Sequence, residues 1–231
     1  MPSRDEPGID MYQDLELIGL GPDDSFNLFF KCLDDNLNYG WTRNVREEKS
    51  VKLPREARCY HCDSAGIRKA ANLWISKKNR ATWEISNVVP DEYGKLTFSE
   101  YNTILMDFFN HFIKKDIHKF GIKAHLKDSK QYLSEFLNPR VFELFCLFSN
   151  AANKSTGSGH PSDEDRWFQF LFEVFDTGGY KTLYPSTLGR FLEEAYGWDK
   201  DVAYELSIEY ENYLRFLDRY LKHAGIKSED R

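Results

Sequence analysis

Residues 73–85 decide the fold class, and they read LWISKKNRATWEI. Leu73-Trp74-Ile75 and Thr82-Trp83-Glu84-Ile85 are rich in the aromatic and β-branched residues that favour strands. The polar run Lys77-Lys78-Asn79-Arg80 lies between them and predicts a turn. We therefore expect a β-hairpin whose second strand ends at Pro90, since proline cannot donate a hydrogen bond to a neighbouring strand.

More strands are expected on both sides of this hairpin. Charged and apolar residues alternate over Tyr12–Leu20, which predicts a half-buried strand. Shorter strands are expected around Arg58–Cys62 and over Ile122–Leu126. The first part of the chain should therefore contain a small antiparallel sheet with at least four strands.

Two helices should accompany this sheet. Asp23 or Asp24 is expected to cap the first, which has an apolar stripe beginning at Phe26. Thr97-Phe98-Ser99-Glu100 has the pattern of a capping box, in which the hydroxyl and the carboxylate satisfy each other's backbone donors. The helix that follows should end at Gly121.

The second part of the chain has the periodicity of helices only. Four helices are expected, with caps at Asn138, within Ser162–Asp165, at Ser186 and at Asp199. Strands followed by helices favour an α+β fold over a doubly wound sheet. We divide the chain into an α+β half at 1–132 and a helical half at 133–226, packed as one unit, with a frayed tail at 227–231.

The composition indicates a folded, water-soluble chain. Of 231 residues, 18 are Phe, 13 are Tyr and 5 are Trp, which excludes intrinsic disorder. The N-terminus lacks the apolar core of a secretory signal, and no run of about 18 apolar residues predicts a membrane helix. We expect a cytoplasmic protein with no membrane partner and no cofactor.

The net charge of −6 conceals an uneven distribution. Residues 43–80 carry a local charge of +7, with Trp41, Tyr60, Trp74 and Trp83 in or beside them. Basic groups interleaved with aromatic rings are typical of proteins that bind single-stranded nucleic acid. The residues that would serve this function are Arg43, Arg46, Arg55, Arg58, Arg68, Lys69, Lys77, Lys78 and Arg80. A solvated basic hairpin is the plainer interpretation.

The last predicted helix carries the opposite charge. Asp201, Glu205 and Glu209 recur every four residues, so they share one face of the helix and repel one another. Such a face is commonly just solvated. The alternative is a docking surface for a protein partner with a basic surface.

Two patterns resemble chemical sites without completing one. Cys59-Tyr60-His61-Cys62 has the spacing of a zinc or redox pair, yet the sequence has no second pair to supply the remaining zinc ligands. On the helix after Thr97, Asp107, His111 and His118 are expected within a narrow arc, where an Asp–His pair could do acid–base work or bind a metal.

No complete catalytic constellation is found, and the sequence favours a non-enzymatic interaction protein of the immunity, antitoxin or regulatory type. A single-stranded nucleic-acid-binding or nucleic-acid-processing protein is the main alternative. A small enzyme that uses His111 with Asp107 is the third hypothesis.

Overall fold

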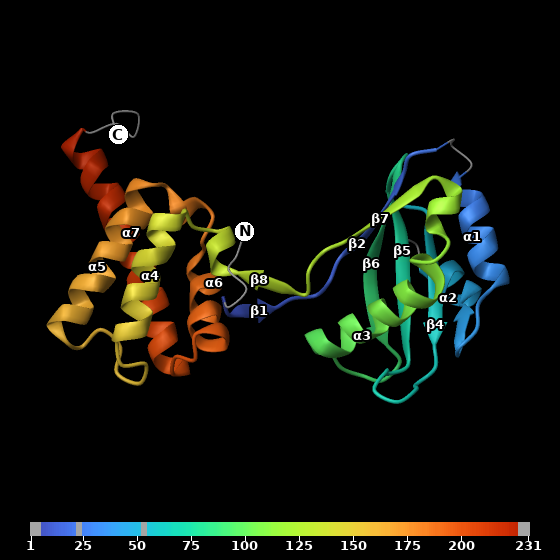
Figure 1. Cartoon of the computed structure of the whole chain (residues 1–231), viewed down its shortest axis with the longest axis horizontal. Helices are drawn as coiled ribbons and strands as arrows, with labels where there is room; N and C mark the ends of the chain where they lie inside the picture. Colours follow the sequence, from blue (N-terminus) through green and yellow to red (C-terminus); the bar gives the residue numbers. More distant parts are fainter. Residues whose placement is uncertain (1–5, 22–24, 52–54, 226–231) are drawn as a thin grey trace. The chain divides into compact units, whose positions relative to one another are not determined.

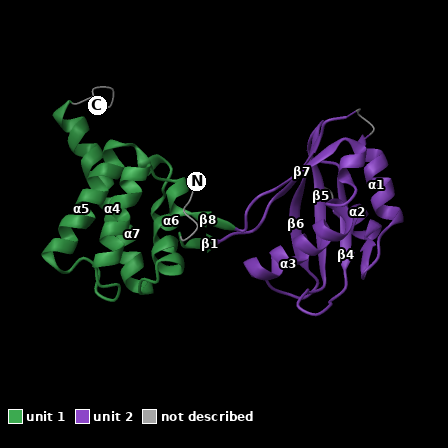
Figure 2. Ribbon diagram, viewed as in Figure 1, with its two compact units in different colours: residues 1–9, 130–231 green, residues 10–129 purple. Residues whose placement is uncertain are grey.

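The computed structural model describes residues 6–21, 25–51 and 55–225. It divides into two compact units, Asp10–Ser129 and Met1–Ile9 with Lys130–Arg231 (Figure 2). The described residues 6–9 thus belong with the C-terminal half. The predicted cap at Asp23 or Asp24 and the predicted tail at 227–231 lie outside the described residues. That the two halves pack as one unit stays a prediction.

The unit Asp10–Ser129 is built on a six-stranded antiparallel sheet (Figure 1). The strand order is β3-β4-β5-β6-β2-β7. The strands are β2 (Leu15–Gly19), β3 (Trp41–Arg43), β4 (Ala57–Cys62), β5 (Ala71–Asn79), β6 (Thr82–Pro90) and β7 (Ile122–Leu126). The helical segments are α1 (Ser25–Asp35), α2 (Val45–Ser50), α3 (Phe98–Phe108), the π-helical turn η1 (Phe109–Ile113) and the 3-10 helix η2 (Ile117–Phe120).

The predicted hairpin forms the centre of this sheet. Strands β5 and β6 pair along their whole length, with a register shift between Trp74 and Ile75 and another between Lys77 and Asn79. The predicted turn is shorter than expected, since pairing continues to Asn79 and Thr82 and only Arg80 and Ala81 lie between. The hydrogen-bonded ladder thus continues into the polar run that was predicted to form the turn.

One face of the sheet packs against α1 and α3. Phe29 and Phe30 of α1 and Phe108 of α3 are buried in the same core as Tyr60 and Trp83 of the sheet. Phe30 and Trp83 meet edge-on with ring centroids 4.7 Å apart, an arrangement that aromatic quadrupoles favour. This core accounts for much of the aromatic content.

The helix after Thr97 begins as predicted and ends earlier. The Thr97–Glu100 capping box is present. The α-helical pattern stops at Phe108, however, and the chain continues through the π-helical turn η1 into the separate helix η2. Gly121 ends η2 with a φ of 64°, a conformation that glycine adopts without a steric penalty.

The second unit is a helical bundle with a small two-stranded sheet (Figure 1). Its helices are α4 (Pro139–Ala151), α5 (Pro161–Asp176), α6 (Pro185–Arg190) and α7 (Lys200–Ala224). Three short turns, η3 (Leu133–Glu135), η4 (Gly179–Lys181) and η5 (Phe191–Ala195), connect or extend them. Strands β1 (Gly8–Asp10) and β8 (Lys130–Tyr132) pair with each other. The predicted α+β class is confirmed, with four helices in the second half.

Two of the four predicted caps in this unit hold. Asn138 accepts a hydrogen bond from the Val141 N–H, and Asp199 accepts from the N–H groups of the first turn of α7. Helix α5 instead begins after His160, whose Nδ1 accepts from the Ser162 N–H. Helix α6 starts at Pro185, one residue before the predicted cap, because proline suits the first helical position.

None of the described helices combines the length and the apolar character needed to cross a bilayer.

Candidate functional site

The predicted basic region is largely neutralised by acidic residues from other elements. Seven of its nine candidate cations lie within ion-pair distance of a carboxylate. Arg80 also has an interaction partner, and Arg46 is exposed. The seven pairs are Arg43–Asp34, Arg55–Glu84, Arg58–Asp34, Arg68–Asp107, Lys69–Glu100, Lys77–Glu56 and Lys78–Glu16.

Asp34 at the end of α1 is the densest of these junctions. Its Oδ2 lies 2.9 Å from Arg43 and 2.8 Å from Arg58, and its Oδ1 accepts the Tyr60 hydroxyl at 3.0 Å. The guanidinium of Arg58 also stacks on the Phe30 ring at 4.5 Å. These ion pairs hold α1 on the sheet, so the two cations are neutralised within the fold.

The aromatic rings expected beside the cations are buried. Trp41, Tyr60 and Trp83 belong to the core beneath α1 and α3, and Trp74 is also buried, at 8% exposure. Base stacking needs an open ring face. None of the four rings offers such a surface in the structure.

The Cys59–Cys62 pair cannot hold one metal ion. The two residues lie three apart in strand β4, where side chains alternate between the faces of the sheet. Cys59 Sγ contacts Asn72 at 3.5 Å, and Cys62 Sγ donates to the Lys69 carbonyl from the core side. Burial raises the pKa of Cys59 to about 12 and that of Cys62 to about 11, so neither thiol is activated. His61 instead pairs with Asp91 at 2.8 Å. Among the described residues, no group of His, Cys, Asp and Glu could hold a metal.

The acidic face of α7 is different, because its carboxylates have no cation. Asp201 and Glu205 are exposed and Glu209 is half-buried. No ion pair joins any of the three to a described residue, whereas Glu211 and Asp218 on the same helix pair with Arg215 and Lys222. The acids on this face are therefore free to interact with a partner.

Apolar side chains lie between these carboxylates. Tyr204 is 66% exposed and Ile208 is 38% exposed. Tyr204 lies three residues after Asp201, and Ile208 lies three after Glu205, which places them on the same face of the helix. Leu206 and Tyr210 point the other way, into the bundle. The outer face of α7 thus combines negative charge with two apolar contact points.

Glu209 lies where this face meets α5. Partial burial raises its pKa, and repulsion from Glu164 and Glu205 acts in the same direction, while the Trp167 indole opposes the rise. Trp167 is 1% exposed, and its indole faces the Glu209 carboxylate. Repelling acids and a buried indole donor therefore meet at Glu209.

The structure brings Asp107 and His111 together and separates His118 from them. His111 Nδ1 lies 2.8 Å from the Asp107 carbonyl oxygen and 3.4 Å from its carboxylate. His118 is exposed on η2, beyond the point where the α-helical pattern ends, so the expected arc of three residues does not form.

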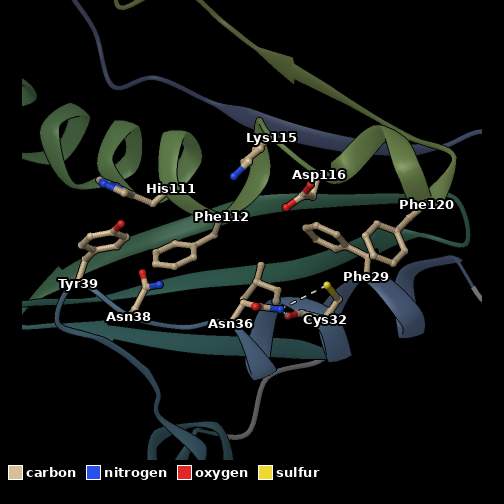
Figure 3. Close-up of a pocket in the computed structure, with 11 residues that line it drawn as sticks. Phe29, Cys32, Asn36, Asn38, Tyr39, His111, Phe112, Lys115, Asp116 and Phe120 are labelled. Carbon is tan, nitrogen blue, oxygen red and sulfur yellow. Dashed lines mark hydrogen bonds between the residues drawn. The ribbon is translucent and has the colours of Figure 1, made fainter.

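His111 lines a cavity of about 240 Å³ between α1 and the segment from η1 to η2 (Figure 3). Asn36, Asn38 and Tyr39 line it from the chain after α1, and Lys115 and Asp116 from the chain after η1. Phe112 lies at its centre in the close-up (Figure 3).

Sequence reasoning missed several of these residues. One sequence signal did point to Tyr39, since it follows a helix and precedes Gly40, where the chain turns. A tyrosine in the left-handed conformation is nevertheless not expected there. Tyr204 and Ile208 could have been found by noting which apolar residues of α7 fall outside its buried stripe. The interaction of Trp167 with Glu209 has no signal in the sequence.

Comparison of the chain with protein-family models, curated proteins and solved structures finds no match.

Proposed function

We propose that this protein binds another protein through the outer face of α7 and that the partner has a basic surface. An immunity, antitoxin or regulatory role would use such a contact. One observation carries the proposal: Asp201, Glu205 and Glu209 have no cation among the described residues, although most basic candidates of the chain are paired internally.

The exposed apolar groups on this face support a protein partner. Tyrosine is enriched at the centres of protein interfaces because its ring buries a large area and its hydroxyl stays wet. Tyr204 stands out from the helix at 66% exposure, with Ile208 one turn further on. The row of acids beside these two apolar side chains provides polar contacts next to a hydrophobic contact, as protein interfaces commonly do.

The electrostatics favour a cationic partner. Glu164, Glu205 and Glu209 repel one another, and this repulsion contributes to the raised pKa of Glu209. A lysine or arginine docked between them would remove that repulsion, and complementary charge would also speed association.

The nucleic-acid alternative has less support. Its cations would have to leave Asp34, Glu84, Glu16 or Asp107 before they could neutralise phosphates. Its rings are buried. It stays a second hypothesis. Its signature would be binding to single-stranded nucleic acid that weakens steeply as the salt concentration rises.

The test is affinity capture from an extract of the native host, followed by reconstitution with the purified partner. The variant Asp201→Lys/Glu205→Lys/Glu209→Lys should lose about 100-fold or more in affinity, because three attractions become repulsions. Wild-type affinity should also fall as salt increases.

The matched control reverses three exposed acids elsewhere, Asp35→Lys/Glu92→Lys/Glu193→Lys. This control changes the net charge by the same amount as the α7 variant does, and it should bind the partner with wild-type affinity. Full affinity in the α7 variant, or equal losses in both variants, would contradict the proposal.

A further inference from the structure

The cavity beside His111 has an ordered imidazole with one nitrogen free for a ligand. The Asp107 carbonyl oxygen can only accept a hydrogen bond, so Nδ1, at 2.8 Å, must carry the proton. Nε2 is then the ring nitrogen left for a ligand. The Tyr39 ring packs against the imidazole, with centroids 4.5 Å apart and ring planes tilted by 42°, and restricts its orientation.

A buried arginine helps to hold both Tyr39 and the Asp107–His111 pair. Arg68, 7% exposed, pairs with the Asp107 carboxylate and donates to the Tyr39 carbonyl at 2.9 Å. Trp41 Nε1 donates to the same carboxylate at 2.7 Å. The imidazole is therefore positioned by groups that are themselves fixed, as binding sites require.

Tyr39 has an unfavourable backbone conformation. Its φ of 54° lies in the left-handed region, and it is the only described non-glycine residue with a positive φ. Such strain persists where surrounding contacts impose it, and it clusters at ligand sites. Here the contacts with Arg68 and His111 impose it.

The charge around the cavity is positive. Lys115 extends into it and has no ion pair among the described residues (Figure 3). Asp116 is already paired with Lys119. Asn38 adds an amide donor, whereas the free Nε2 of His111 is an acceptor. A ligand should therefore bring negative charge to Lys115.

The cavity also has flat apolar surfaces. Phe112 lies between the rings of His111 and Tyr39 on one side and those of Phe29 and Phe120 on the other (Figure 3). A planar group could lie against such rings. A volume of about 240 Å³ limits the ligand to a small molecule.

We propose that this cavity binds a small planar molecule that carries a phosphate or carboxylate group, with the oxyanion on Lys115 and the planar part on Tyr39 and Phe112. Aromatic carboxylates and nucleoside monophosphates share this chemistry. The site lies within Asp10–Ser129 and is independent of the α7 surface.

The test is a titration of the full chain with adenosine monophosphate, uridine monophosphate, benzoate and inorganic phosphate, followed by calorimetry and by amide chemical shifts. At least one planar probe should shift the amides of residues 36–39 and 111–116 and bind more tightly than inorganic phosphate. A nucleotide that binds while benzoate does not identifies a phosphate ligand, and the converse identifies a carboxylate.

Three variants locate the binding. Lys115→Gln should weaken it about tenfold by removing a charge-assisted hydrogen bond. Lys114→Gln is the matched control, since Lys114 is exposed and does not line the cavity. Tyr39→Asn keeps a residue that tolerates positive φ and should weaken the planar probes without affecting inorganic phosphate.

Failure of every planar probe to shift these amides at about 10 mM would overturn the proposal, because a site this weak would not be functional. Equal affinity of the Lys115→Gln and wild-type chains would also overturn it. The α7 triple variant should bind the probes normally, so a failed docking surface and a failed cavity are distinguished.

Discussion

The basic region around residues 43–80 and the acidic face of α7 illustrate two fates of surface charge. In the basic region, carboxylates from α1, α3 and neighbouring strands neutralise the cations and tie the elements together. On α7, three acids lie next to one another with no cation among the described residues. Local charge in a sequence therefore indicates a binding surface only when the fold leaves that charge unpaired.

The largest expected effect comes from breaking the most buried pair. Asp107→Ala leaves Arg68 without its carboxylate at 7% exposure, and also removes the acceptor of the Trp41 indole. The free energy of unfolding should fall by about 3 kcal/mol. Urea unfolding measures this. Asp14→Ala, which breaks the exposed pair with Lys127, should cost about 0.5 kcal/mol or less. Equal costs would contradict the structural role of the buried pair.

A smaller loss is expected at the end of α1. Asp34→Asn weakens bonds to Arg43, Arg58 and the Tyr60 hydroxyl at once, and should cost about 2 kcal/mol. The same urea unfolding experiment applies. The neighbouring Asp35→Asn, at an exposed position, should change stability by less than about 0.5 kcal/mol. If Asp34→Asn left the free energy of unfolding unchanged, these cations would be available for ligands.

On the acidic face of α7, removing a charge should stabilise the protein rather than destabilise it. The pKa of Glu209 is raised above its ordinary value of 4.5, so the folded state binds this proton more tightly than the unfolded state does. Stability of the helical unit should therefore decrease as the pH rises from about that value through the raised pKa. Hydrogen exchange of α7 amides across this range measures the trend.

The variant Glu209→Gln should flatten this pH dependence and add a few tenths of a kcal/mol at neutral pH (about 0.3 kcal/mol for each repulsion removed). Glu211→Gln provides the matched control, because Glu211 has a cation partner in Arg215 at 3.5 Å. If the two variants show the same pH dependence, the repulsion on this face is not significant.

Local patterns in the sequence predicted most of the elements. The hairpin, the Thr97 capping box, strand Ile122–Leu126 and the caps at Asn138 and Asp199 each depend on neighbouring residues. Strand β3 was missed because its three residues become a strand only by pairing with β4. Strands β1 and β8 were missed for the same reason, since each needs a partner more than 100 residues away in the sequence.

The candidate sites were harder to predict because their properties depend on distant partners. The charge of +7 over residues 43–80 said nothing of Asp34, Glu100 or Asp107, which lie outside that range. The Asp107–His111 contact was predicted from its helical spacing, yet the π-helical turn that moves His118 away had no recognisable signal. The orientation of Tyr39 depends on Arg68, which is also remote in the sequence.

The acids on the outer face of α7 are available to a partner, whereas the cations of residues 43–80 are largely neutralised within the fold. The most direct test is a parallel titration at low salt with a lysine-rich peptide and with a single-stranded DNA oligonucleotide, followed by amide chemical shifts. We predict that the peptide shifts the amides of residues 201–209 and that the DNA leaves those of residues 43–80 unchanged. Shifts in residues 43–80 with DNA, together with an unperturbed α7 in the presence of the peptide, would contradict the claim.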